Sequence, residues 1–210
     1  MHRLALFFIM LLTSQVEAQN ETQYETGMQK AFALWQDNKT EEATNLFERI
    51  ANADNKNWLP SYYAAQVLIY DAFSKLQDPQ AMALQLKRAQ NFINDATTNS
   101  KDNAEILVLQ ALLHTAYVAS DGAKYGMTLA PKVARIYAQA YKLEPKNPRV
   151  ILKQAGWSKG TAEYFGQDTA PFCVEFNKAL ELFANFKPES AFHPNWGKEE
   201  AEAMVKSCKQ

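Results

Sequence analysis

Apolar residues recur along most of the chain with the period of an α-helix. In residues 104–119, for example, Leu107, Ala111 and Val118 are four and seven residues apart and therefore lie on one helical face. Short polar stretches rich in Asn, Asp, Lys and Pro separate such segments. The pattern predicts an all-α protein built from pairs of helices. The first helix of each pair is expected at 22–37, 59–77, 104–119 and 148–160, and the second at 40–52, 79–97, 130–143 and 171–186.

The second helix of each pair ends on a pattern that recurs along the chain. In its clearest copy, Val133, Tyr137 and Ala140 are followed by Pro145, with spacings of four, three and five residues. The equivalent end positions in the other pairs are Asn55, Lys101 and Pro188, so that successive ends are 46, 44 and 43 residues apart. A regular spacing of this kind indicates a repeat protein. The alternative is an irregular all-α bundle whose helix ends coincide.

Asparagine precedes the first helix of three pairs in the same register. Asn57, Asn103 and Asn147 each follow an end position by two residues. An Asn side chain accepts a hydrogen bond from the free amides of a first helical turn, so each is a predicted N-cap. Pro148 then takes the first helical position, where its missing N–H costs nothing. Longer connections within pairs are expected at 121–131 and 161–171.

The repeat resembles the tetratricopeptide repeat (TPR). The second helices carry an apolar–aromatic–small pattern that ends in Pro, and the first helices carry a small residue at equivalent positions: Ala31, Ala65, Ala111 and Gly156. TPR units of 34 residues stack into a right-handed solenoid, whereas longer units also suit HEAT-type pairs. The resemblance implies a right-handed α-solenoid of about four TPR-like helix pairs plus a C-terminal capping helix, expected at about 197–208.

A closer resemblance covers residues 121–208. The stretches "PKVARIYAQAYKLEPKNPRV", "TAEYFGQD" and "PNWGKEEAEAMVKSC" are similar to exported tetratricopeptide-like proteins of Bacteroidetes. This resemblance implies an exported compartment and a helical repeat fold, and it implies no reaction. The tripeptide around Thr169 also resembles an O-glycosylation acceptor of that group.

The N-terminus carries the pattern of a secretory signal peptide. A short basic start precedes nine apolar residues, 4–12, and small or apolar residues stand at Val16 and Ala18. Nine residues are too few to span a bilayer, which takes about 20. Residues 1–18 are therefore a predicted signal peptide, with a TPR-like domain at 19–210. The alternatives are an N-terminal membrane anchor and a buried first helix.

Charge gives no reason to expect a nucleic-acid partner. The chain has a formal net charge of −1 and a pI of about 6.3, so it has no bulk attraction for nucleic acid or anionic lipid. No stretch of the mature chain is long and apolar enough to span a membrane. The expected location is the periplasm, or outside the cell after secretion.

Two cysteines in an exported chain predict a disulfide. Cys173 opens the helix expected at 171–186, and Cys208 closes the terminal helix. If these neighbouring helices are antiparallel, both cysteines lie at the same end, which predicts a Cys173–Cys208 bond. The alternative, a nucleophilic cysteine, has no histidine nearby in sequence to activate it.

The remaining polar residues indicate no catalytic, metal or cofactor site. His114 lies on an apolar helical face and is expected in the core, and His193 precedes a proline and is expected in a turn. Glu163 and Asp168 could add carboxylates near His193, but no metal-ligand spacing or catalytic motif is present. We therefore predict no catalytic residues, no metal and no cofactor.

A concave surface is the usual binding surface of stacked helical pairs, and it is lined by the first helices. Taking the small residues as equivalent positions predicts an aromatic-rich groove suited to an extended peptide or a partner helix. Its expected members are Met28, Phe32, Trp35, Tyr62, Gln66, Val108, Leu112, Lys153 and Trp157. The alternative is that many of these side chains pack between repeats.

Three functions follow from these patterns. The first is a non-enzymatic periplasmic scaffold that binds a protein or peptide of the cell envelope through the concave groove. The second is a small-ligand-binding accessory component of an envelope transport system, which a closed pocket between the 161–169 loop and the helices would favour. The third, an enzyme, has no catalytic residues to support it.

Overall fold

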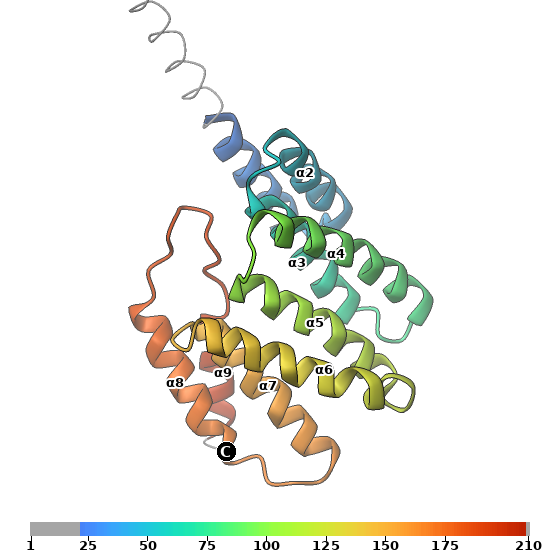
Figure 1. Cartoon of the computed structure of the whole chain (residues 1–210), viewed down its shortest axis with the longest axis vertical. Helices are drawn as coiled ribbons and strands as arrows, with labels where there is room; N and C mark the ends of the chain where they lie inside the picture. Colours follow the sequence, from blue (N-terminus) through green and yellow to red (C-terminus); the bar gives the residue numbers. More distant parts are fainter. Residues whose placement is uncertain (1–21, 209–210) are drawn as a thin grey trace, which may run out of the picture.

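All regular structure in residues 22–208, the part of the chain described by the computed structural model, is α-helical. The first helix covers residues 22–36 of this part. Figure 1 shows the following helices packed as successive pairs, with a long connection between the last two. Their bounds are α2 (Thr40–Ala53), α3 (Trp58–Phe73), α4 (Pro79–Asn99), α5 (Ala104–Ser120), α6 (Gly122–Leu143), α7 (Pro148–Tyr164), α8 (Phe172–Asn185) and α9 (Lys198–Ser207).

The predicted N-caps are confirmed. The side-chain oxygens of Asn57, Asn103 and Asn147 accept hydrogen bonds from the backbone amides two residues ahead, at 3.1, 2.9 and 2.9 Å. Pro148 is the first residue of α7. These caps set the starts of α3, α5 and α7, and therefore the register of the side chains that each of these helices presents.

The predicted connection at 121–131 is wrong, because α6 begins at Gly122. The side chain of Asp121 caps this helix by accepting from the amide of Lys124 at 2.9 Å. Pro131, expected near the helix start, lies inside α6. A proline within a helix leaves one carbonyl without its donor. The first half of α6 is exposed, with Met127 almost fully in solvent, so that water can hydrate the free carbonyl.

The other helix ends differ less from the prediction. The helix expected at 59–77 ends at Phe73, and α7 continues through Tyr164, so that the connection to α8 is reduced to residues 165–171. Gly166 in this connection has a φ of 65°, a left-handed conformation that glycine adopts without strain. The predicted terminal helix is present as α9.

The recurring pattern of the second helices marks their buried faces. Val133, Tyr137 and Ala140 are all buried on α6, and Phe176 and Phe183 are buried at the equivalent positions of α8. The larger core cluster lies among the first helix and α2–α6 and reaches Val150 at the start of α7, and a smaller one joins α7, α8 and α9. Helices α3, α5 and α7 also contact one another in sequence order, so they form one inner row.

The last pair is closed by a disulfide. Cys173 at the start of α8 bonds Cys208 after α9, with the two Cα atoms 5.8 Å apart, which confirms the predicted pairing. Joining residues 35 positions apart restricts the unfolded chain and stabilises the fold by about 4 kcal/mol in the chain-entropy model. The disulfide holds α9 against α8.

The predicted signal peptide, residues 1–18, lies outside the described residues. Within residues 22–208, none of the helices combines the length and the hydropathy needed to cross a bilayer.

His114 gives the stability of this fold a specific pH dependence. Burial, with a smaller effect from nearby Lys132, lowers the pKa of His114 from 6.5 to about 4. Between these two values the unfolded chain binds a proton that the folded protein does not. We therefore expect the free energy of unfolding to decrease as the pH is lowered from 6.5 to 4.

The measurement is urea unfolding of the wild type and of His114→Gln at pH values on both sides of that window. The variant keeps an amide that can bond Gln110, whose side chain lies 3.1 Å from Nε2 of His114. The pH dependence should be shallower in the variant because it lacks the titrating group. Equal dependences in the two proteins would contradict this assignment.

Candidate functional site

Most residues of the predicted concave groove are buried. Met28, Tyr62, Gln66, Val108, Leu112 and Lys153 have almost no exposed surface, whereas Phe32, Trp35 and Trp157 are half-buried. The prediction that these side chains line an open groove therefore needs correction. Part of the cover comes from residues 186–197, the connection between α8 and α9, which we call the C-terminal strap.

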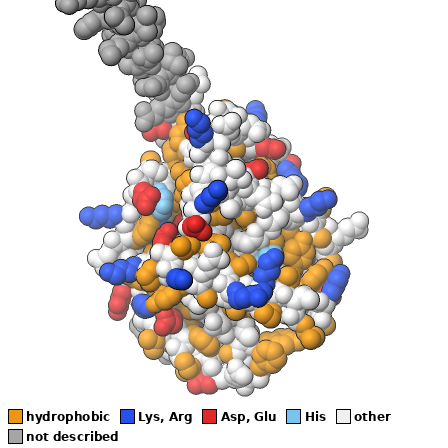
Figure 2. Space-filling view, viewed as in Figure 1, with side chains coloured by type: hydrophobic (Ala, Val, Ile, Leu, Met, Phe, Trp, Pro, Cys, Tyr) orange, Lys and Arg blue, Asp and Glu red, His pale blue; other side chains and the backbone are white. Residues whose placement is uncertain are grey.

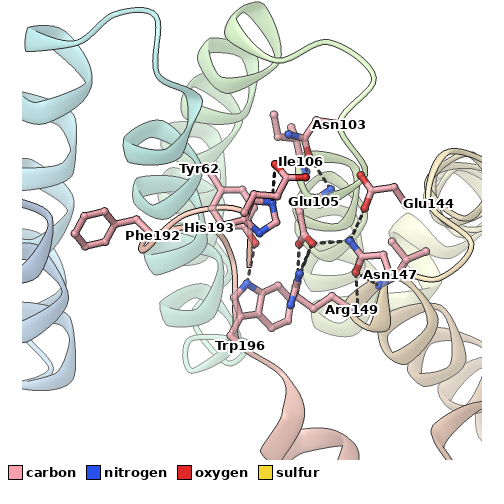
Figure 3. A network of polar contacts seen from close by, with 12 residues as sticks. Tyr62, Asn103, Glu105, Ile106, Glu144, Asn147, Arg149, Phe192, His193 and Trp196 are labelled. Carbon is pink, nitrogen blue, oxygen red and sulfur yellow. Dashed lines mark hydrogen bonds and ion pairs between the residues drawn. The ribbon is translucent and has the colours of Figure 1, made fainter. Parts of the chain in front are cut away.

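The strap crosses the inner row of helices and contacts it through aromatic side chains. The ring of Phe192 stacks on Phe32 with the ring centres 6.2 Å apart, and the hydroxyl of Tyr63 donates to the Phe192 carbonyl at 2.8 Å. The indole N–H of Trp196 donates to the hydroxyl of Tyr62 at 2.8 Å (Figure 3). Predicted groove residues thus bind a segment of their own chain.

Lys153, another predicted groove residue, is also engaged within the chain. Its ammonium lies 2.6 Å from a carboxylate oxygen of Glu200 on α9 and 5.4 Å from the centre of the Trp196 ring. A cation in this position is stabilised both by the carboxylate and by the ring face. Lys153 therefore helps to hold the strap and α9 against α7.

A buried ion pair lies beneath the strap. Arg149 and Glu105 are both removed from solvent, and Nη2 of Arg149 lies 2.6 Å from Oε1 of Glu105 (Figure 3). Nε of Arg149 donates to both oxygens of the same carboxylate, at 2.8 and 2.9 Å. Asn147 donates to that carboxylate at 2.6 Å. The guanidinium carbon also lies 4.3 Å from the centre of the Phe186 ring in the strap.

The sequence contains a signal for this pair that helical periodicity alone does not reveal. Glu105 and Arg149 each follow the N-cap asparagine of their unit by two residues. Opposite charges therefore occupy equivalent positions in consecutive units, where stacking would bring them together. The connection "FKPESAFHPNW" at 186–196 is also rich in aromatic residues, which an exposed connection does not need.

The histidines do not form a site with the carboxylates named above. His193 lies in the strap between the rings of Trp58 and Phe186, each about 6.1 Å away. Glu163 instead pairs with Lys159, and the carboxylate of Asp168 accepts from the amide of Ala170. Among residues 22–208, no three His, Cys, Asp or Glu side chains are grouped as metal ligands would be.

An open groove remains on the other side of α7, between α6 and α8. It consists of two adjoining clefts of about 220 and 300 Å³ that share Gln154, Ser158 and Phe172. We call it the α6–α8 groove. The first cleft is also lined by Ala134, Tyr137, Trp157, Thr161, Ala162 and Gln167, and the second by Tyr141, Ile151, Ala155, Glu175 and Lys178.

The groove combines aromatic walls with a polar floor. Phe172 and Trp157 are half-buried, so part of each ring is accessible. Gln154 and Ser158 lie one turn apart on α7, and neither side chain has a hydrogen-bond partner within residues 22–208. Such a surface can take a flat apolar molecule and orient it by a few hydrogen bonds.

Several exposed apolar side chains are close in sequence to residues that line one end of the groove. Tyr164 and Phe165, at the end of α7, are 75% and 67% exposed, and Val174 in the first turn of α8 is 69% exposed. Figure 2 shows hydrophobic side chains at this lower end of the molecule, where Figure 1 places the α7–α8 connection. Neighbouring exposed apolar side chains of this kind often mark a binding surface.

The sequence anticipated only part of this site. A pocket beside residues 161–169 was the feature that would favour a small ligand, and Thr161, Ala162 and Gln167 do line the first cleft, which is open rather than closed. Trp157 was assigned to the concave face but lines this cleft. Phe172 and Lys178 were missed, because nothing in the helical pattern distinguishes a residue facing a groove from one facing solvent.

No protein-family model and no curated protein matches this chain. Among solved structures, the HusA haemophore from Porphyromonas gingivalis matches with a TM-score of 0.76 over 88% of this chain and 92% of HusA. This chain has the fold of HusA. At 24% sequence identity the likeness concerns the fold. The HusA haemophore comes from a member of the Bacteroidetes, the group whose exported proteins residues 121–208 resemble.

The buried ion pair can be tested by removing one partner or both. Arg149→Met leaves the Glu105 carboxylate buried without its cation, which should lower the free energy of unfolding by about 3–5 kcal/mol. Adding Glu105→Gln should recover part of this loss because no unpaired charge then remains. Chemical denaturation measures both effects.

The matched control is the exposed pair Lys159–Glu163, for which Lys159→Met should cost less than about 1 kcal/mol. If Arg149→Met is no more destabilising than Lys159→Met, the buried pair does not have the structural role assigned to it.

Proposed function

We propose that this protein is an exported, non-catalytic carrier of a flat, largely apolar small ligand of the haem type, bound in the α6–α8 groove. The observation that carries the proposal is the groove itself, an accessible surface with aromatic walls and unpaired polar groups. Its two clefts together have the size of an ordinary small-ligand site, which spans about 300–1,000 Å³. The shared fold with a haemophore supports the choice of a haem-type ligand.

The same observations count against a peptide-binding scaffold. The concave groove expected to hold a peptide is covered in part by the C-terminal strap, and Tyr62 and Lys153 already have partners there. A partner peptide would have to displace Trp196 and Phe192 from their contacts. Small-ligand binding needs no such displacement, because the α6–α8 groove is open.

Export to an oxidising compartment is part of this proposal. The Cys173–Cys208 disulfide is the kind of bond that persists outside the cytosol. The predicted signal peptide supplies the route. Delivery to the periplasm and secretion from the cell are both compatible with a carrier that passes its ligand to an envelope transport system.

The finer description of the fold belongs to this proposal as well. A right-handed TPR-like solenoid of about four helix pairs, capped by α9, stays a prediction. Its support is the row of contacts from α3 to α5 to α7. In such an arrangement the α6–α8 groove lies between the second helices of two consecutive units, with α7 as its floor.

Titration with ferric haem tests the proposed function. Binding should change the haem absorbance and quench the fluorescence of Trp157. Trp157→Ala and Phe172→Ala should each weaken binding by about tenfold or more, because each removes an aromatic wall worth at least about 1.4 kcal/mol of contact. Circular dichroism establishes that the variants are folded.

Leu84→Ala on α4 is the control, since Leu84 is 65% exposed and does not line the groove. The affinity of Leu84→Ala for haem should equal that of the wild type. Failure of the wild type to bind haem, or an equal loss in Leu84→Ala, would rule out the proposed site.

A further inference from the structure

The two ends of the α6–α8 groove differ in charge. Among the described residues, those that line the cleft with Trp157 are all neutral, whereas the other cleft contains Glu175 and Lys178. These two residues lie three positions apart on α8, so both face the groove from the same helical turn. The groove therefore has a neutral, aromatic end and a charged end. A ligand that fits this groove should likewise have one apolar end and one charged end.

Lys178 is the cation available to a ligand at the charged end. Its ammonium lies 5.6 Å from the centre of the Tyr141 ring on α6, across the groove. Its partner on α8, Glu175, is 3.8 Å away, and both side chains are nearly half exposed. An exposed pair at this distance is weak, so that Lys178 can exchange Glu175 for another carboxylate at little cost.

The two lysines of α7 are less available than Lys178. Lys153 is buried and paired with Glu200 behind the strap, and Lys159 is paired with Glu163. Within the described residues, Lys178 is the only cation among the side chains that line the groove. An acidic ligand can therefore form an ion pair with the groove in one orientation, with its acidic group at Lys178.

We propose that Lys178 anchors the carboxylate edge of the ligand, which fixes the orientation of the ligand in the groove. This inference rests on the proposed function. The acidic edge lies between Lys178 and Tyr141, and the apolar ring system extends over Phe172 toward Trp157. Glu175 repels the same edge, so the pair tunes affinity in opposite directions: Lys178 favours an acidic ligand and Glu175 disfavours it.

The experiment compares ferric haem, which carries two carboxylates, with its dimethyl ester, which carries none. Lys178→Gln should weaken binding of haem by about three- to tenfold, as expected for loss of one charge-assisted contact at a partly exposed site. Glu175→Gln should tighten binding of haem by a smaller factor. Neither substitution should change the affinity for the ester, because the ester has no carboxylate to interact with Lys178 or Glu175.

Lys187→Gln is the matched control, since Lys187 is an exposed lysine that follows α8 and does not line the groove. It makes the same change in net charge and should leave both affinities unaltered. Raising the salt concentration should reduce the difference between the wild type and Lys178→Gln for haem, because salt screens the ion pair.

The outcomes separate this inference from the proposed function. If the wild type binds neither compound, the proposed function fails and the anchor with it. If both compounds bind and Lys178→Gln leaves the affinity for haem unchanged, the groove is a ligand site but Lys178 is not its anchor. An equal loss for haem and for the ester would also overturn the anchor, because the side chain would then act through packing.

Discussion

Glu105 and Arg149 form an ion pair that is almost completely removed from water, and the last helix pair and the strap depend on it. Charges in such a place are tolerated only when they are paired and hydrogen-bonded, and Asn147 and the Arg149 Nε–H supply those bonds. Separating α5 from α7 would leave both charges unpaired in the core. Because the Arg149 guanidinium also lies against Phe186, the same pair positions the first residue of the strap.

The position of the strap decides which surface of the protein is covered. With Trp196 bonded to Tyr62 and Phe192 stacked on Phe32, the strap covers part of the inner row of helices. Within residues 22–208 nothing comparable covers the opposite side, because no strong contact joins α6 to α8 and α7 forms the floor between them. After α8 the chain returns over the inner row of helices. It therefore covers that side and leaves the α6–α8 groove open.

Sequence patterns predicted local structure better than they predicted accessibility. The Asn caps and the buried faces of α6 and α8 depend on short-range spacing, and the disulfide depends on the packing of two neighbouring helices; the structure confirms all three. The extra turns of α6 were missed because Pro131 was interpreted as a boundary, although an exposed helix tolerates it. The groove was misplaced because the strap contacts residues more than 120 positions away, such as Tyr63, and no periodicity records a contact of that range.

The most direct test uses the four tryptophans of the chain as reporters in a ¹H–¹⁵N NMR titration with a diamagnetic gallium porphyrin. We expect the indole resonance of Trp157, which lines the α6–α8 groove, to shift on binding. The indole resonance of Trp196, which donates to Tyr62 beneath the strap, should keep its position, as should that of Trp58. A shift of the Trp196 resonance with no change at Trp157 would contradict binding in the α6–α8 groove, because it would place the ligand on the strap-covered face.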